Sequence, residues 1–170
     1  VTGGSANPTA IRFTGTDTGV AITRASGAGR VYRTTDGGVS WTLVKSVDFG
    51  LAGITFVDAN IGYAVGDIAV RTPKPSVSAL LTTVYGGATW VESTMAEGTN
   101  AVDLSGIRCA TVLRCVMTTT KGDQLLRTEN AGVTVAAVSP ATDPIRAAAF
   151  ASASRVVAAG AFGTTVISDD

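Results

Sequence analysis

The sequence predicts an all-β fold, a β-propeller of about four blades, each a four-stranded antiparallel sheet. The first observation is a motif that begins at Thr34 and recurs from Thr83, Thr128 and Ser168, a period of about 40 to 50 residues. The second is that short runs of alternating apolar and polar residues, bounded by Gly, Asp and Asn, precede each copy. The third is that no segment carries a capped helical period, so we expect no helix.

The four repeats span residues 10–47, 51–93, 103–139 and 144–170, and we expect one propeller domain, or part of one, over residues 1–170. In the second repeat, the pattern predicts strands at residues 53–58, 62–66, 79–84 and 89–93. The other repeats align with it and predict strands at residues 10–15, 19–25, 29–35 and 40–45, at 106–111, 114–119, 124–129 and 134–139, and at 145–151, 155–160 and 164–169. Pro73 and Pro75 mark an enlarged loop, because proline cannot donate a ladder hydrogen bond.

The recurring motif predicts the tight hairpin between the third and fourth strands of each repeat. Glycine takes a positive φ without steric cost, an Asp before it accepts hydrogen bonds from the turn amides, and a Trp after it covers the hairpin. The second copy has Tyr85 in place of the Asp, and the third has Asn130 there and Val135 in place of the Trp. We therefore predict a structural role, not a ligand-binding one, for Thr34, Asp36, Gly38, Ser40, Trp41, Gly87, Trp90, Asn130 and Gly132.

This motif resembles the Asp-box, or BNR repeat, S/T-x-D-x-G-x-S/T-W, which in Asp-box proteins lies on the outer rim of the propeller and serves folding. Residues 51–66 resemble the repeat of the photosystem II assembly and stability factor family and its bacterial relatives. That repeat has a Phe and an Asp at the end of one strand and G-(aromatic)-x-V-G in the next. The resemblance covers essentially the whole chain. It implies a seven-bladed, extracytosolic propeller that binds subunits of an assembling complex.

The chain carries three complete repeats and most of a fourth, whereas a propeller closes when its first and last blades meet. Three arrangements account for this. The chain is part of a larger ring, such as a seven-bladed one, or another chain closes the ring, or residues 1–5 complete the last blade of a small propeller.

The two cysteines, Cys109 and Cys115, flank the first hairpin of the third repeat. Two strands joined by a short loop bring such residues within disulfide range, and the alternative is a pair of free buried thiols. A disulfide would indicate an oxidising, extracytoplasmic compartment such as a periplasm, a lumen or the cell surface. A metal site is disfavoured, because two thiolates make half a zinc site and the chain has no histidine.

The charge balance does not favour a nucleic-acid partner, since Lys and Arg number 13 and Asp and Glu number 13. Four arginines of the first repeat are expected on a solvated face: Arg12, Arg24, Arg30 and Arg33. No run of about 18 apolar residues is present, so we expect no membrane span.

We expect no catalytic residues, no cofactor and no enzymatic activity. Without histidine, Ser-His and Cys-His catalysis are excluded within this chain. Sialidases share the Asp-box, but Arg12 lacks the R-I-P surroundings of that family. Paired carboxylates for glycoside hydrolysis are not evident, since four aspartates occupy turns or linkers with nothing to pair them: Asp58, Asp67, Asp103 and Asp143.

These observations predict a non-enzymatic, extracytoplasmic scaffold that binds protein, as a subunit or an assembly and stability factor of a larger complex, such as a membrane-bound or photosynthetic one whose subunits would be its partners. Propellers bind through loops, and the candidate partner-binding residues lie in two of them: Arg71, Lys74, Glu97 and Asn100. The alternative, which the Asp-box favours, is a carbohydrate-binding surface module or a fragment of a sialidase-like glycosidase. A third hypothesis is a purely structural stack of blades within a larger surface protein.

Overall fold

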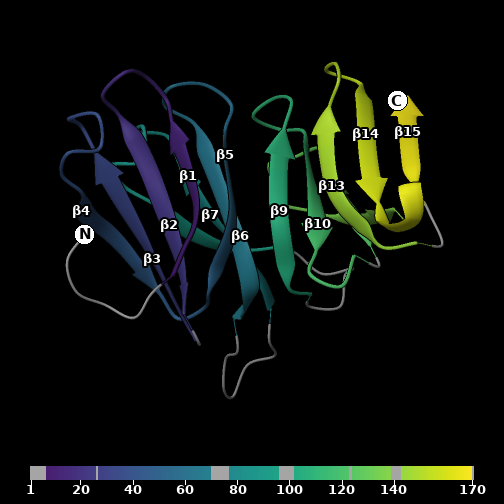
Figure 1. The fold of residues 1–170 in the computed structure, drawn as a ribbon, viewed down its shortest axis with the longest axis horizontal. Helices are drawn as coiled ribbons and strands as arrows, with labels where there is room; N and C mark the ends of the chain where they lie inside the picture. The colour runs from purple at the N-terminus through teal and green to yellow at the C-terminus, as the bar shows by residue number, and fades with distance from the viewer. Residues whose placement is uncertain are drawn as a thin grey trace.

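The computed structural model describes residues 7–25, 27–69, 77–95, 102–122, 124–138 and 143–169, which form four antiparallel sheets, here blades 1 to 4 (Figure 1). In every blade the strands pair in the order in which they follow along the chain. Blade 1 contains β1 (Asn7–Phe13), β2 (Gly19–Ala25), β3 (Ala28–Thr34) and β4 (Thr42–Val47), and blade 2 contains β5 (Leu51–Phe56), β6 (Gly62–Ala69), β7 (Val77–Thr83) and β8 (Val91–Thr94). Blade 3 contains β9 (Leu104–Cys109), β10 (Cys115–Thr119), β11 (Leu125–Thr128) and β12 (Ala136–Val138). Blade 4 contains β13 (Ile145–Phe150), β14 (Arg155–Gly160) and β15 (Thr165–Asp169). The predicted all-β fold class is confirmed. A 3-10 turn at Ala161–Gly163 is the one helical segment among the described residues.

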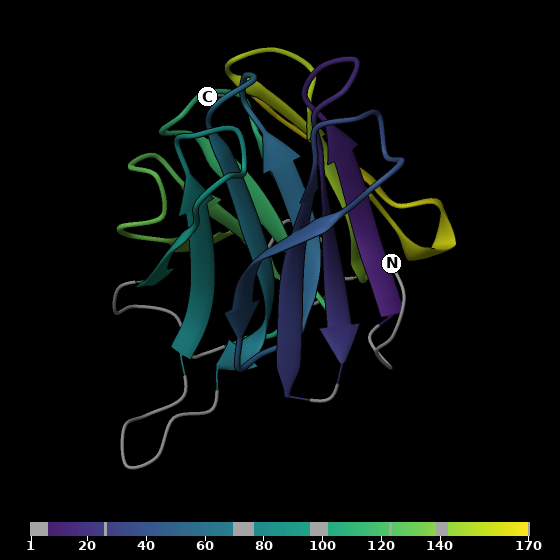
Figure 2. The ribbon, with the colours of Figure 1, turned by 90° about the vertical axis from the view of Figure 1, so that its left-hand side faces the viewer.

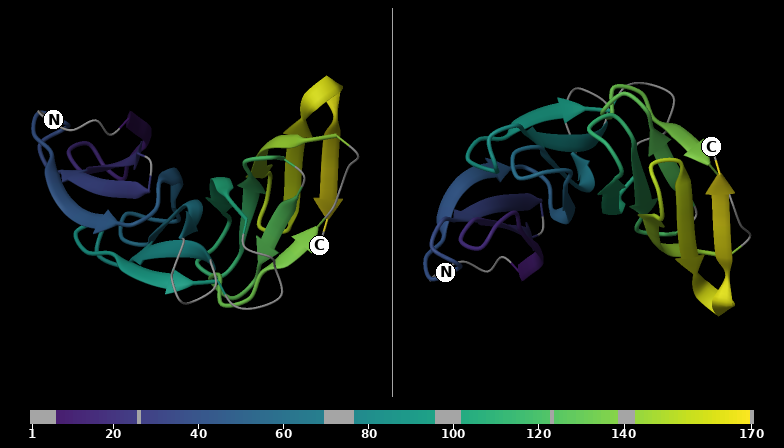
Figure 3. Two further views of the ribbon diagram at one scale, coloured as in Figure 1. Left: turned by 90° about the horizontal axis from the view of Figure 1, so that it is seen from below. Right: turned by 90° about the horizontal axis from the view of Figure 1, so that it is seen from above.

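The blades follow one another along an open arc (Figure 3). The first strands of the blades, β1, β5, β9 and β13, lie on the inner side of the arc and contact one another in succession. The fourth strands of blades 1 to 3 lie on its outer side. β1 and β15 are therefore at opposite ends of the arc, and the inner strands share one concave surface.

The first strands of blades 1 to 3 end two residues earlier than predicted, whereas β14 has the predicted bounds. In blades 2 and 3 the reason is a side-chain turn directly after the strand, made by Asp58 and by Thr111. In blade 2 the Asp58 carboxylate accepts hydrogen bonds from the backbone N–H of Asn60 at 2.7 Å and of Ile61 at 2.8 Å. Such a turn competes with strand pairing, so the residues around Asp58 leave the ladder.

Apolar side chains fill the space between successive blades. In blade 2, Ile54, Ala64 and Leu81 are cross-strand partners on β5, β6 and β7, and all three are buried against blade 1. The corresponding row of blade 3 is buried against blade 2 and consists of Ile107, Met117 and Leu126. Burial of this apolar row against the preceding blade is the main stabilising contact between blades.

Blade 1 carries the same row, but nothing in the described part of the chain covers it. Ile11 pairs with Ala21, Ala21 with Tyr32, and Tyr32 with Leu43. Ile11 is 46% exposed and Leu43 is 49% exposed. Figure 2 shows blade 1 in front, with no other blade over its outer face. This end of the arc therefore presents a face of the kind that packs against a blade.

The hairpin between β3 and β4 is held by side chains of its own motif. The Thr34 hydroxyl accepts a hydrogen bond from the N–H of Gly38 at 2.9 Å and donates one to the Asp36 carboxylate at 2.7 Å. Asp36 also accepts hydrogen bonds from the N–H and the hydroxyl of Ser40. Gly38 has φ +95°, a conformation that favours glycine. The polar side chains thus satisfy backbone N–H groups within the turn.

These hydrogen bonds lower the pKa of Asp36 to about 2 from an ordinary 3.8, with the Ser40 hydroxyl as the largest cause. Because the folded pKa is depressed, the ionised carboxylate stabilises the fold above pH 3.8, and this contribution is lost as the pH falls through 2. We expect Asp36→Asn to flatten the loss of thermal stability over this pH window. Unfolding temperatures measured at a series of pH values check this, and equal slopes for both proteins would contradict it.

The other two hairpins show which motif residues are interchangeable. In blade 3 the Asn130 side chain accepts a hydrogen bond from the N–H of Thr134 at 2.8 Å and donates one to its hydroxyl. In blade 2 Tyr85 offers no such acceptor and is exposed, and the turn keeps the bond from the N–H of Gly87 to the Thr83 hydroxyl at 3.1 Å. The threonine–glycine bond is thus common to all three hairpins, since Gly132 donates to Thr128 in the same way.

Candidate binding pocket on the inner strands

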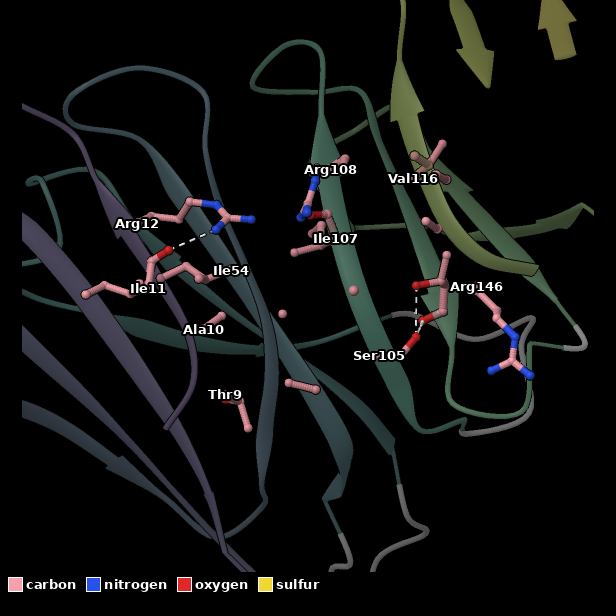
Figure 4. Close-up of a pocket in the computed structure, with 16 residues that line it drawn as sticks. Thr9, Ala10, Ile11, Arg12, Ile54, Ser105, Ile107, Arg108, Val116 and Arg146 are labelled. Carbon is pink, nitrogen blue, oxygen red and sulfur yellow. Dashed lines mark hydrogen bonds between the residues drawn. The ribbon is translucent and has the colours of Figure 1, made fainter. Parts of the chain in front are cut away.

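A pocket with a volume of about 360 Å³ lies on the concave surface, lined by the first strands of all four blades (Figure 4). Its shape follows from a layer of small residues at equivalent positions of these strands: Ala10, Gly53, Gly106 and Ala147. A Cβ atom on Gly53 would lie 2.7 Å from the Cα atom of Gly106. The two middle strands therefore approach each other this closely because Gly53 has no side chain.

The upper part of the pocket in Figure 4 is cationic. Arg12 of blade 1 and Arg108 of blade 3 point toward each other, with Ile54 of blade 2 between their strands. Each guanidinium donates a hydrogen bond from Nη1 to the carbonyl oxygen of the preceding residue, at 2.8 Å to Ile11 and at 2.7 Å to Ile107. Two blades thus present arginine in the same conformation from the same position of the repeat.

The positive charges of Arg12 and Arg108 repel each other, so the pair favours binding of an anion. Burial is the main cause that lowers the pKa of Arg108, and the positive charge of Arg12 lowers it further. The lining also includes Arg146, which Figure 4 shows pointing away from the other two. None of the described residues that line the pocket is Asp or Glu. A planar carboxylate or a phosphate between Arg12 and Arg108 would relieve their repulsion and accept charge-assisted hydrogen bonds.

Hydroxyl groups line the opposite part of the pocket, but they are engaged in the fold. The Thr9 hydroxyl donates to the carbonyl oxygen of Leu51 at 2.8 Å, which ties blade 1 to blade 2. The Ser105 hydroxyl lies 2.9 Å from that of Thr118 within blade 3. These bonds fix β1 and β9, and hence the positions of the two arginines.

The pattern that marks the arginine pair is present in the sequence but is easily missed. Ile11-Arg12-Phe13 and Ile107-Arg108-Cys109 occupy the same place in two repeats. Only Arg12 belongs to the arginines named from the sequence, and Arg108 carries no motif of its own. Aligning the repeats on the ends of their first strands would have brought the two arginines together.

The predicted turn residues lie away from this pocket. They occupy the hairpins that lead to the outer strands β4, β8 and β12, and none of them lines the pocket. The candidate partner-binding residues Arg71, Lys74, Glu97 and Asn100 lie outside the described residues.

The two cysteines occupy a special position of the repeat. Cys109 and Cys115 are cross-strand partners on β9 and β10, and their sulfur atoms are at disulfide-bonding distance. The equivalent partners in blade 1 are Phe13 and Gly19. The cysteine pair therefore stands where another blade packs an aromatic ring over a glycine.

Metal-binding and membrane-spanning features also bear on function. The described residues contain no group of three or more His, Cys, Asp and Glu side chains placed to hold a metal ion. In the same part of the chain, no helix has the length and hydrophobicity that crossing a membrane requires.

Solved structures with a similar fold are β-propellers. YCF48 bound to a D1 peptide superimposes with a TM-score of 0.63 at 20% identity over 92% of this chain and 49% of that chain. The GH74 enzyme of Niastella koreensis gives a TM-score of 0.66 at 14% identity over 92% and 26%. The computationally designed Ika4 protein gives 0.63 at 14% identity over 98% and 93%. The chain thus spans about half the length of YCF48, and these likenesses show the fold.

No protein-family model matches the sequence, and no curated protein matches it significantly. The structure-based likeness to YCF48 agrees with the resemblance that the repeat pattern indicated, at the level of the propeller fold.

Proposed function

We propose that this chain is a non-enzymatic, protein-binding β-propeller that holds a carboxylate-bearing segment of its partner between Arg12 and Arg108. The observation that carries the proposal is the facing of two guanidinium groups across a concave pocket whose described lining contains no acidic side chain. Arginine forks bind carboxylates in a bidentate manner, and a propeller commonly binds at its central face. YCF48, a propeller of related fold, was solved bound to a peptide, which supports a polypeptide ligand here.

We further propose that the chain acts outside the cytosol as a scaffold, or as an assembly factor of a larger complex. The support for the compartment is the cysteine pair, because a disulfide at Cys109 and Cys115 would persist only in an oxidising environment. The turn motifs are proposed to be Asp-boxes with a folding role. Their side chains satisfy the hairpin backbone in blades 1 and 3 and lie outside the pocket.

The second candidate function is a carbohydrate-binding or glycosidase fragment, which the likeness to GH74 enzymes favours. Paired carboxylates are the usual catalytic groups of such enzymes. The described lining of this pocket offers arginine, hydroxyl and apolar groups instead. If the chain hydrolyses glycans with paired carboxylates, those carboxylates therefore lie outside the described lining of this pocket.

A peptide array tests the proposal against its alternative. Acidic decapeptides and their matched amide versions, with Gln for Glu and an amidated C-terminus, are probed with the wild-type chain, Arg12→Gln and Arg108→Gln. We expect binding of the acidic peptides only, and each substitution to weaken it about tenfold through one lost charge-assisted contact. Arg30→Gln, on β3 outside the pocket, is the matched control.

Two outcomes would overturn the proposal. One is equal binding of the acidic and amide peptides, or binding that survives both arginine substitutions. The other is silence on the peptides together with binding on a glycan array, or turnover of a fluorogenic glycoside, which would establish the carbohydrate alternative.

A further inference from the structure

Arg146 of blade 4 is the third arginine of the pocket on the inner strands, and it lies in the lower part of the pocket as Figure 4 shows it. Its side chain is exposed and points away from Arg12 and Arg108. It forms no ion pair with a described residue, and the described lining offers it no Asp or Glu. A single carboxylate held between Arg12 and Arg108 therefore leaves Arg146 without a counter-ion.

The strand registers place the layer of small residues between these two cationic ends. Gly106 of β9 and Ala147 of β13 belong to that layer, and the two strands contact each other and run in the same direction (Figure 1). Arg108 follows the layer by two residues, whereas Arg146 precedes it by one. At about 3.3 Å per residue, the two arginines start about 10 Å apart along the strand direction.

The small residues leave room for a polypeptide backbone to pass from one end of the pocket to the other. No side chain of the layer extends beyond Cβ: Ala10, Gly53, Gly106 and Ala147. The pocket volume of about 360 Å³ is also larger than one carboxylate requires. The described lining includes no aromatic side chain on which a nucleic-acid base could stack, so the shape and chemistry favour a peptide.

We propose that this pocket binds an extended acidic segment with two carboxylates three residues apart, a Glu-x-x-Glu or equivalent Asp pattern. One carboxylate lies between Arg12 and Arg108, and the other lies at Arg146. Residues three apart in an extended chain are separated by about 10 Å and point to opposite sides, as cations on different blades at two heights require. The inference rests on the proposed function, because the first carboxylate is the one that the arginine pair holds.

The spacing of the two acidic residues, and not their number alone, is the expected determinant of affinity. Once the arginine pair holds the first carboxylate, the second is confined near Arg146 at a high effective concentration. Adjacent acidic residues are too close together to reach both ends of the pocket. Widely separated ones reach both ends only by looping out the chain between them, which costs conformational entropy.

Three decapeptides of equal net charge test the inference in a fluorescence anisotropy titration. Each contains two glutamates among Gly and Ser residues, either adjacent, with two residues between them, or with six residues between them. Acetylated and amidated ends remove the terminal charges, and a fourth peptide carries a single glutamate. We expect the Glu-x-x-Glu peptide to bind about tenfold more tightly than any of the other three, through one further charge-assisted contact.

Arg146→Gln should abolish this tenfold gain and leave the affinity of the single-glutamate peptide unchanged. Arg30→Gln removes a positive charge on β3, outside the pocket, and as the matched control it should keep the gain. Arg12→Gln should instead weaken the binding of all four peptides. Because Arg146 is exposed, we expect its variant to unfold at the wild-type temperature, which circular dichroism checks.

Two results would overturn this inference and leave the proposed function standing. One is equal affinity for the three spacings, and the other is a gain that Arg146→Gln does not reduce. A single-glutamate peptide that binds no better than its glutamine version would contradict the proposed function, and this inference with it. Tighter binding of a short single-stranded oligonucleotide than of the Glu-x-x-Glu peptide would also overturn the inference, because the preferred anions would then be phosphates.

Discussion

Trp90→Ala is expected to lower the free energy of unfolding by about 3–5 kcal/mol. The side chain is buried between blades 1 and 2, meets Phe56 edge to face, and donates from Nε1 to the carbonyl oxygen of Gly87 at 3.0 Å. Its removal leaves a large cavity at an interface that holds two blades together. Urea unfolding, followed by circular dichroism, measures the loss.

Trp41→Ala is the matched control. Trp41 donates the same hydrogen bond, to the carbonyl oxygen of Gly38 at 3.0 Å, and makes the same edge contact with Phe13. No blade covers it in the described part of the chain, so it is only half-buried. We expect a smaller loss for this variant, about 1–2 kcal/mol. Equal losses for the two variants would mean that the hairpin, and not the contact between blades, accounts for the stability.

The fold was predictable from sequence because its local signals repeat. The hydrogen bonds of the turn are local in the sequence, since the Thr34 hydroxyl and the Asp36 carboxylate each accept one from an amide four residues later. Strand ends were less predictable, because the sequence pattern allows Asp58 either as the last residue of a strand or as the first of a turn. In the structure its side chain accepts the hydrogen bonds of a turn. The propeller fold thus follows from short-range chemistry that any one repeat contains.

The pocket was not predictable in the same way, because no single repeat contains it. Arg12 and Arg108 are brought together by the packing of β1, β5 and β9, and that packing depends on the close approach at Gly53 and Gly106. Each arginine alone is an ordinary residue on an inner strand. Binding residues were expected in loops, whereas Arg12 and Arg108 lie on strands, in a pocket whose described lining contains no acidic side chain.

Blades 1 and 4 form the two ends of the arc that the described strands make. The repeats are compatible with a larger ring, a second chain, or completion by residues 1–5, which lie outside the described residues. The arc separates β1 from β15, and each end carries a surface that blades bury elsewhere in the chain. Ile11 and Leu43 are exposed at one end and Ile167, 61% exposed, at the other. Both surfaces are of the kind that blades bury against one another within the described part of the chain.

The cysteine pair yields the second large effect that we expect. Replacing both residues in Cys109→Ser, Cys115→Ser should cost about 2 kcal/mol if a disulfide closes this loop of six-residue separation. The predicted signatures are a mass two hydrogens below that of the dithiol and a lower urea midpoint on adding reductant. Thiols that alkylate readily in the native, unreduced protein would contradict it.

The repeat itself supplies the control for this experiment. Blades 1 and 2 have Phe opposite Gly at the same cross-strand position, as Phe13 with Gly19 and Phe56 with Gly62. In both, the ring lies over the glycine so closely that an added Cβ would touch it. Cys109→Phe, Cys115→Gly should therefore recover part of the stability that the serine pair loses, and should make it insensitive to reductant. If this variant is as unstable as the serine pair, other positions of blade 3 have also adapted to the cysteines. The first such position is Val135, which stands where blade 2 has Trp90.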